Sequence, residues 1–390
     1  YTLMTFLTSI FLGLSMGSGA LFSIYRGRGD ESSLRLGIVH AFGLILCVTL
    51  MLNATVYLFL GPILRFLQVP ESVAPGMREY LLIIFAGLLA TSLYNYLSCL
   101  LRALGNSTVP LVFLAVSAML NIGLDLLFVL VFHWGIAGAA WATVIAQYMS
   151  GVGILWFFLA KCKHLLPKKK ELHYDRAILK DIFQLSSLTC VQQSVMNFGI
   201  LMVQGLVNSF GATVMAAFAA AVKIDTFAYL PVQDFGNAYS TFVAQNFGAG
   251  DSARIRAGTR RAFLISTAFS LATSALVCVF AAPLMGVFVS ADETAVIASG
   301  VRYLRIEGAF YAGIGCLFLL YGFYRAVGRA GMSVVLTVIS LGTRVALAYA
   351  LAGTLGEVGI WAAIPIGWAL ADVTGYGYYL LRRTRLLPEE

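Results

Sequence analysis

The stretch Val109–Phe132, VPLVFLAVSAMLNIGLDLLFVLVF, is the segment from which the fold of this chain is inferred. It is long and apolar enough to cross a bilayer, because about 20 helical residues span roughly 30 Å of hydrocarbon. Asp125 lies inside it, four residues after Asn121 and eight after Ser117, so the three side chains share one helix face. An ionisable group at this depth normally faces protein or a water-filled cavity, which makes Asp125 a functional candidate.

The composition is that of a polytopic helical membrane protein. Hydrophobic residues make up 60% of the chain and charged residues 11%, whereas soluble domains carry about a quarter charged residues. Long continuous apolar runs favour helices over an outer-membrane barrel, whose strands alternate. The net charge of +8 does not indicate nucleic-acid binding, because Lys and Arg lie in short segments between apolar runs. The six scattered cysteines form no CxxC pair, so no metal site or disulfide is predicted.

The apolar pattern predicts eleven membrane-spanning segments. They cover residues 1–25, 34–62, 79–103, 109–133, 136–160, 183–209, 213–246, 259–289, 298–325, 332–354 and 357–381. Turn residues, Pro70 and Pro75 among them, mark the breaks. One connection, 161–182, is long and strongly polar, and we interpret it as a linker between an N-terminal lobe, 1–160, and a C-terminal lobe, 183–390.

Basic residues indicate the orientation of the chain. Those on one set of alternate connections are numerous and include the linker, the Arg254–Arg261 segment and the tail Arg382–Arg385. The opposite connections hold few. By the positive-inside rule the linker and the C-terminus face the cytoplasm, and Asp125 lies in the outer half of its segment.

The chain contains an internal repeat. Shifted by 221 positions, Gly27–Asp30 matches Gly248–Asp251, and shifted by 223 positions, Arg102–Gly105 matches Arg325–Gly328. Blocks in the same order at nearly constant offset predict two parallel, pseudo-symmetric halves. The segment 183–209 has no partner before Tyr1, so we expect a parent architecture of two six-helix bundles whose first helix of twelve is absent here.

The repeat also shows which residues of the first half have no counterpart of the same type in the second half. At the shift of 223, Asp125 corresponds to Ala348 and Asn121 corresponds to Arg344. The acidic face therefore exists only in the first half and is not needed to build the repeat.

These features together resemble the multidrug and toxic compound extrusion (MATE) family of secondary transporters. The resemblance covers essentially the whole chain and rests on the order and spacing of four short motifs: RALGN at 102–106, N-x-x-x-D at 121–125, GIAGAA at 135–140 and QNFGAG at 245–250. It implies export of amphipathic, often cationic compounds in exchange for H⁺ or Na⁺, with two halves around a central cavity.

The resemblance also suggests site residues. Asn121 and Asp125 match the fifth-helix pair of a first-half cation site, and Asn95 is a looser candidate for its fourth-helix member. An Asp on the first helix cannot be assigned here. Family members with a second-half site use acids on the seventh and tenth helices, and because the seventh helix offers only amides here, a second-half sodium site is not expected. Those amides are Gln192, Gln193 and Asn197.

Further polar residues inside apolar segments are candidates for the cavity. Asp234, with Gln233 and Asn237 nearby, is one group, Asp372 and Arg344 are further candidates, and Gln192 and Asn197 of the seventh helix complete the set. For Arg344 we expect an acidic partner such as Asp372 or Asp234. Lys223 and Asp225 are placed near the outer mouth, either as a gating pair or as side chains that snorkel to the surface.

The sequence thus predicts a monomeric antiporter of a bacterial inner membrane that acts on small molecules. It needs no cofactor besides the transported ion, and no nucleotide-binding Gly-x-x-x-x-Gly-Lys-Ser/Thr motif occurs, which favours an ion gradient over ATP. A lipid-linked saccharide flippase of the same superfamily is the alternative. An intramembrane enzyme is not expected, because the four histidines are dispersed.

Overall fold

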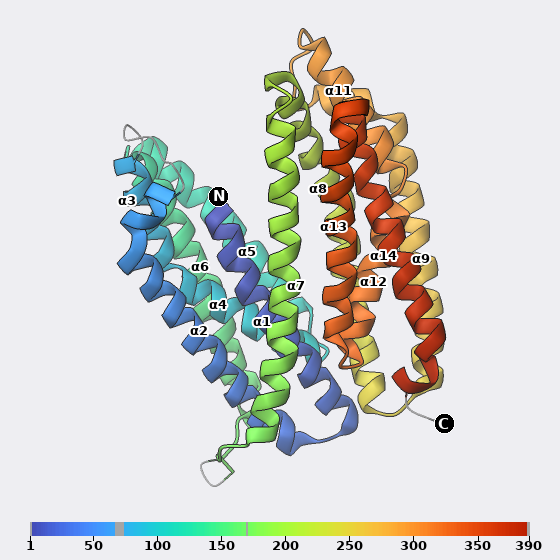
Figure 1. Cartoon of the computed structure of the whole chain (residues 1–390). Coiled ribbons are helices and arrows are strands. Elements are labelled where there is room, and N and C mark those ends of the chain that lie inside the picture. Colours follow the sequence, from blue (N-terminus) through green and yellow to red (C-terminus); the bar gives the residue numbers. More distant parts are fainter. Residues whose placement is uncertain (1, 67–73, 169–170, 388–390) are drawn as a thin grey trace. The chain divides into compact units, whose positions relative to one another are not determined.

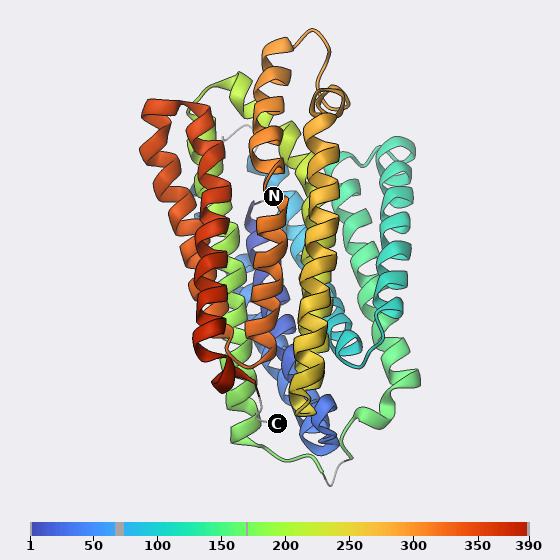
Figure 2. The ribbon, with the colours of Figure 1, turned by 90° about the vertical axis from the view of Figure 1, so that its right-hand side faces the viewer.

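The structure, a computed structural model, describes residues 2–66, 74–168 and 171–387. These residues form helices and no β-strand, which confirms the all-α membrane fold predicted from the sequence. Helices are required because backbone N–H and C=O groups in hydrocarbon must be satisfied within the chain. Figures 1 and 2 show the long helices in two views at right angles.

Among the described residues, nine helices are long and apolar enough to cross a membrane, and two bent pairs raise this number to as many as eleven. The pairs are α3 (Ala74–Ala86) with α4 (Leu88–Ala103), bent by 40°, and α11 (Thr294–Gly308) with α12 (Tyr311–Ala326), bent by 51°. The sequence pattern had predicted an unbroken segment at each place. The predicted break at Pro70 lies outside the described residues.

Packing divides the chain into two compact units, Tyr1–Arg26 with Asp30–Cys190, and Gly27–Gly29 with Val191–Glu390. The first unit contains α3, α4, α1 (Thr2–Arg28), α2 (Glu31–Phe66), α5 (Thr108–Asp125), the π-helix η1 (Leu126–Val131), α6 (Gly135–Lys161), the short 3₁₀-helix η2 (Lys163–Leu165) and the start of α7 (Arg176–Asn208). The second contains the rest of α7, α11, α12, α8 (Ala212–Gly248), α9 (Ser252–Val279), α10 (Ala281–Gly286), α13 (Ala330–Leu355) and α14 (Glu357–Leu386). The division lies inside α7, beyond the linker, and the predicted lobe limits stay a prediction.

The repeat is visible in backbone conformation. Gly29 and Gly250, 221 positions apart, have φ values of +73° and +75°, in the left-handed region that glycine tolerates. After each of them an Asp side chain caps the next helix: Asp30 Oδ1 accepts from the Ser33 amide at 3.0 Å, and Asp251 Oδ1 accepts from the Arg254 amide at 2.8 Å. The two bent pairs also occupy corresponding places, so the duplication includes turns, caps and helix breaks.

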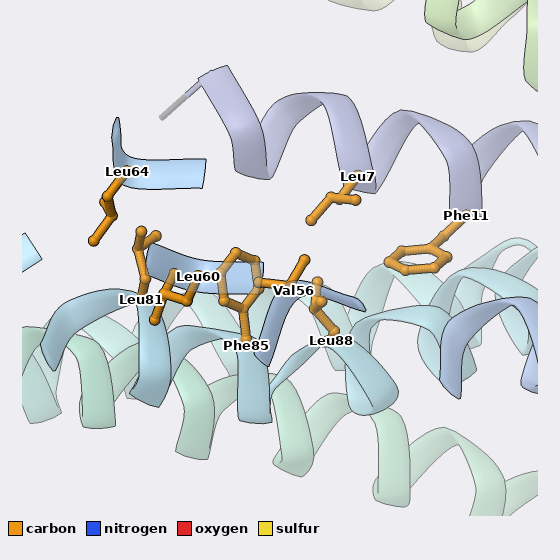
Figure 3. Packing of buried hydrophobic residues seen from close by; sticks show 8 residues of the cluster. All are labelled: Leu7, Phe11, Val56, Leu60, Leu64, Leu81, Phe85 and Leu88. Carbon is orange, nitrogen blue, oxygen red and sulfur yellow. The ribbon is translucent and has the colours of Figure 1, made fainter. Parts of the chain in front are cut away.

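The core of the first unit is built where α1, α2, α3 and α4 meet. Figure 3 shows eight buried side chains from these helices in one cluster: Leu7, Phe11, Val56, Leu60, Leu64, Leu81, Phe85 and Leu88. Polar side chains close to it bond to backbone or to each other, as Asn53 Nδ2 does to the Phe85 carbonyl at 2.8 Å. Thr49 and Ser92 share a 2.7 Å hydrogen bond. Such bonds between helices hold a membrane bundle together where lipid is as apolar as leucine.

Glycines on α1 permit a close approach to the first half of α7. A Cβ atom at Gly13 would overlap the backbone of Cys190, and one at Gly17 would overlap that of Leu185 and Ser186. The Gly-x-x-x-Gly pattern of α1 is therefore a helix-packing motif.

Glycines play the same part in the second unit, where Gly236 on α8 and Gly322 on α12 bring these helices together. A Cβ at Gly322 would lie 2.6 Å from the Gly236 carbonyl oxygen. Ser240 Oγ donates to the Gly322 carbonyl at 2.9 Å. In Figures 1 and 2, α13 and α14 run side by side, in agreement with their extensive packing.

The linker after α6 is attached to the start of α2. Arg35 contacts Glu31 at 3.2 Å and Glu171 at 3.5 Å. The His40 Nε2 atom accepts the Asp175 backbone amide at 3.2 Å. The linker is thus bonded to α2 within the first unit.

Candidate functional site

Asp125 is the last residue of α5, at the point where the α-helix continues into the π-helix η1. Its Oδ1 atom is buried and has no hydrogen-bond partner in the described part of the chain. No basic side chain among the described residues forms an ion pair with it. A buried carboxyl oxygen without a donor is ready to bind a proton or a cation, and π turns in helices are frequent at functional sites.

Asn121 and Ser117 extend the Asp125 stripe along α5 toward α6. Ser117 Oγ donates to the Ala146 carbonyl at 2.7 Å, and Asn121 Nδ2 lies 3.4 Å from Thr143 Oγ1. Elsewhere on α5, Met119 and Ile122 are exposed by 75% and 61%, as a lipid-facing surface requires. Ser117 and Asn121 therefore lie on a face of α5 that packs on α6, and the role predicted for this face in binding a cation stays a prediction.

Asn95 does not join this pair. Its Nδ2 atom donates to the Thr91 carbonyl of its own helix at 2.9 Å, and no hydrogen bond connects it to Asn121 or Asp125 in the described residues. Its assignment to the cation site stays a prediction.

The residues predicted for the cavity lie in the second unit on four helices, and no hydrogen bond joins any two of them in the described residues. Asp234 is exposed, Gln233 donates to the Tyr229 hydroxyl at 3.2 Å, and Asn197 donates to the Gln193 carbonyl at 3.1 Å. Asn237 accepts from Arg325 at 3.1 Å. The other three each hold a buried polar atom without a hydrogen-bond partner: Gln192 Oε1, Arg344 Nε and Asp372 Oδ1.

A second acidic cluster, formed around Asp225, was missed by sequence reasoning. Asp225 is only 8% exposed and accepts hydrogen bonds on both oxygens, from Tyr303 at 2.5 Å and from Tyr311. Asp225 is therefore neither a side chain that snorkels to the surface nor, among the described residues, the ion-pair partner of Lys223, as the sequence had suggested. Lys223 is exposed and its Nζ atom lies 5.6 Å from the ring centre of Phe288.

Glu307, 7% exposed, is the second acid of this cluster. It lies in the last turn of α11 and Tyr311 in the first turn of α12, so the 51° break of this helix pair falls between them. Broken helices of this kind commonly form ion and substrate sites in transporters, because they leave backbone groups and helix ends inside the bundle.

Arg344 on α13 holds a buried Nε atom without a hydrogen-bond partner among the described residues. Its positive charge lies within electrostatic range of Asp225 and Glu307. No ion pair joins Arg344 to its expected partners Asp372 and Asp234 in the part of the chain that the structure describes.

Aromatic rings pack against the cluster. Tyr303 meets Phe218 and Trp361 edge to face, with ring centres 5.4 and 4.9 Å apart, and Phe218 and Trp361 stack at 5.4 Å. Phe218 and Trp361 form no hydrogen bond with the carboxyls among the described residues and cover the ring of Tyr303 with apolar surface. The four-residue spacing of Tyr303 and Glu307 puts these two side chains on one face of α11, but no signal in the sequence indicates that Asp225 and Tyr311 lie beside Tyr303.

Comparison with known proteins shows what the chain is similar to. A family model described as MatE matches residues 1–127 and 189–350. The chain is 30% identical over 393 residues to the "Probable multidrug resistance protein YpnP" of Bacillus subtilis, with 99% of this chain and 86% of that protein covered. It is 23% identical over 361 residues to the "Probable multidrug resistance protein NorM" of Thermotoga maritima, with 90% and 77% covered.

Among solved structures, the outward-facing conformation of a multidrug resistance MATE family transporter of the MOP superfamily has the same fold. The TM-score is 0.93 at 20% sequence identity, with 98% of this chain and 86% of that chain covered. At this identity the likeness concerns the fold alone.

Proposed function

The chain belongs to the MatE family of multidrug and toxic compound extrusion transporters, and from this premise we propose that it is a secondary active multidrug exporter of a bacterial cytoplasmic membrane. It exchanges amphipathic, often cationic compounds for H⁺ or Na⁺. The names of its bacterial relatives as multidrug resistance proteins support the substrate class. The linker and the C-terminus face the cytoplasm in this proposal, which rests on the distribution of basic residues.

The observation that carries the exchange mechanism is the buried, unpartnered Oδ1 atom of Asp125. A carboxyl that is held by an ion pair would have to break that pair before it could take up a cation. Asp125 has no such partner among the described residues, and Asn121 on the same face supplies an amide one turn away. The corresponding position in the second half is the fully buried Ala348, so the acid serves a purpose that packing does not require.

Coupling follows from differential binding. If the cation binds Asp125 more tightly in one conformation and the exported compound binds more tightly in another, each ligand shifts the same equilibrium in opposite directions. Export then draws on the ion gradient and requires no nucleotide. Since a ligand shifts an equilibrium only by its difference in affinity between the states, loss of the carboxyl removes the coupling while leaving the fold in place.

The test measures ethidium extrusion by vesicles that contain the protein, with imposed proton and sodium gradients. Asp125→Asn is expected to abolish gradient-driven extrusion at unchanged protein level and unfolding temperature. The matched control is Asp292→Asn, which alters an exposed carboxyl outside the predicted spans and should extrude dye as the parent does. Extrusion by Asp125→Asn at the parent rate would contradict the proposal, and a parent that moves no dye under either gradient would favour the lipid-linked saccharide flippase.

A further inference from the structure

The first three turns of α9 carry an exposed basic surface. Arg254, Ala257, Arg261 and Leu264 follow one another at spacings of three and four residues, so they share one helix face. All four are exposed, whereas the opposite side of the helix is buried at Ile255. α9 lies at the surface of the second unit, nearest the viewer in Figure 2, so this face points away from the protein.

The described part of the chain does not balance these charges. Arg254, Arg261 and the equally exposed Arg260 form no ion pair with an acid among the described residues. The nearest acid in the sequence, Asp251, uses its Oδ1 atom to accept the Arg254 backbone amide at 2.8 Å. The three positive charges are therefore available to an anionic partner.

The internal repeat shows that the fold does not require this surface. At the shift of 221 positions, the counterparts of the three arginines on α2 are Ser33, Val39 and His40. A fourth arginine of the segment, Arg256, matches Arg35 and is common to both halves. In the first unit the linker covers this place, and its Glu171 pairs with Arg35 at 3.5 Å. The second unit thus adds positive charge where the first unit supplies an acid of its own.

The length of α9 places the arginines at the level of lipid headgroups. The helix has 28 residues and is about 42 Å long, whereas the hydrocarbon of a bilayer is roughly 30 Å thick. The three arginines lie near its start, and exposed apolar side chains begin directly after them, with Leu264 and Ile265 exposed by 71% and 55%. Acyl chains can therefore cover these apolar residues while the phosphate of the same lipid lies beside the arginines.

The charge of the surface selects the kind of lipid. A guanidinium matches two oxygens of a phosphate, and the small Ala257 between Arg254 and Arg261 leaves room for one. A zwitterionic headgroup would also bring its ammonium toward positive charges, which an anionic headgroup does not. We propose that Arg254, Arg260 and Arg261 bind the phosphate of an anionic phospholipid, with its acyl chains on Leu264 and Ile265. The inference rests on the proposed function only for the assignment of this lipid to the cytoplasmic leaflet.

The experiment uses the full chain, free of cysteine except for Ala257→Cys, which carries a bimane fluorophore in nanodiscs of phosphatidylcholine. Phosphatidylglycerol with a nitroxide near the top of one acyl chain quenches the fluorophore on contact. Phosphatidylcholine with the same nitroxide measures contact without selection. In the parent, half-quenching by phosphatidylglycerol should need a mole fraction at least about five-fold lower, because one arginine near a membrane surface has an effect of about this size.

The variant Arg254→Gln/Arg260→Gln/Arg261→Gln should be quenched equally by the two lipids. Its matched control, Lys161→Gln/Lys163→Gln/Lys180→Gln, removes three exposed positive charges elsewhere and should keep the preference of the parent. Equal quenching in the parent, or an unchanged preference in the arginine variant, would overturn the proposal.

The chain's own acids Glu389 and Glu390, outside the described residues, are the competing occupant. A preference that appears only in Glu389→Gln/Glu390→Gln would show that these acids occupy the surface, which also overturns the proposal. A parent that prefers phosphatidylglycerol but exports no dye contradicts the proposed function alone, because both leaflets of a nanodisc contain both lipids.

Discussion

Ser18 on α1 and Ser186 on α7 share a buried hydrogen bond of 2.9 Å, 168 positions apart in sequence. The bond is possible because Gly17, next to Ser18, presents no side chain to the α7 backbone. Ser18 Oγ also lies 2.9 Å from the Leu14 carbonyl, so the hydroxyl serves both its own helix and its neighbour. The close contact is thus specified by a glycine and a serine together.

Gly17→Ala is expected to destabilise the protein by about 1–3 kcal/mol, because its Cβ has no space between the two helix backbones. The control is Gly43→Ala on α2, where an added Cβ meets no atom within 4 Å. The measurement is the unfolding free energy of each of the two variants and of the parent in mixed detergent. Equal stability of the two variants would show that α1 and α7 do not pack as described.

The attachment of the linker should be sensitive to acid through Glu171. The backbone N–H of Lys168 lowers the pKa of Glu171 below its usual range; desolvation opposes this effect, and the nearby Arg35 adds to it. A carboxyl whose pKa is lowered by folding contributes stability above its ordinary pKa of about 4.3, and this contribution is lost as the pH falls through the lower folded value.

We therefore expect the mobility of a spin label at the exposed Leu172, in a cysteine-free background, to rise in strong acid in the parent. Glu171→Gln should show the high mobility at every pH. A parent whose label mobility does not change with acid would argue against the Arg35–Glu171 contact.

His40 should hold the linker through a hydrogen bond of its own. Its Nδ1 atom lies 2.8 Å from the Leu36 carbonyl, which can only accept, so Nδ1 carries the hydrogen and Nε2 accepts the Asp175 amide at 3.2 Å. Removal of this acceptor should therefore raise the mobility of the label at Leu172.

His40→Phe is the matched variant, because it keeps a ring beside Tyr174, 6.0 Å away between centres, without the accepting nitrogen. Its label should be more mobile than that of the parent at neutral pH. Equal label mobility in His40→Phe and the parent would argue against the His40–Asp175 bond.

Asn237 is expected to stabilise the folded protein by accepting a hydrogen bond from a buried arginine. Its Oδ1 atom accepts from Arg325, which is only 4% exposed, and the Arg325 Nε atom lies 3.4 Å from Ser240 Oγ. Asn237→Ala takes an acceptor from a buried guanidinium and should cost roughly 1–3 kcal/mol of unfolding free energy. The exposed Asn208, which accepts from Gln204 at 2.8 Å, is the control: Asn208→Ala should change stability by less than about 0.5 kcal/mol.

A dye-binding measurement completes this prediction. With Asn237 serving Arg325, the Asn237→Ala protein that remains folded should bind ethidium as the parent does. An affinity that falls at unchanged stability would place Asn237 in the substrate cavity.

The repeat and its turns could be predicted from the sequence because they depend on local chemistry. A left-handed glycine followed by an Asp cap is recognisable at Gly29 and Gly250 without knowledge of the neighbours. The number of segments follows from the length of apolar runs. The breaks after Ala86 and Gly308 could not be predicted in this way, because a bend inside an apolar run leaves the hydropathy of the run unchanged.

The second acidic cluster could not be located by the same reasoning. Hydropathy measures how deep Asp225 lies along its helix but not which helix it faces, and its partners are 78 and 86 positions away. The proximity of the Arg344 charge to Asp225 and Glu307 is similarly a property of tertiary packing, because these residues lie on three different helices. Asp125 and Asn121 were recognised because their spacing alone puts them on one face.

The π-helix that follows Asp125 also has a mechanical consequence. Leu126–Val131 is wound more loosely than the α-helix before it, and tightening by one residue would turn the segment beyond it by about 100° around its axis. Asp125 lies at the seam between the two windings. A rewinding at this point would rotate η1 and the residues that follow it, while α5 before Asp125 keeps its hydrogen bonds to α6.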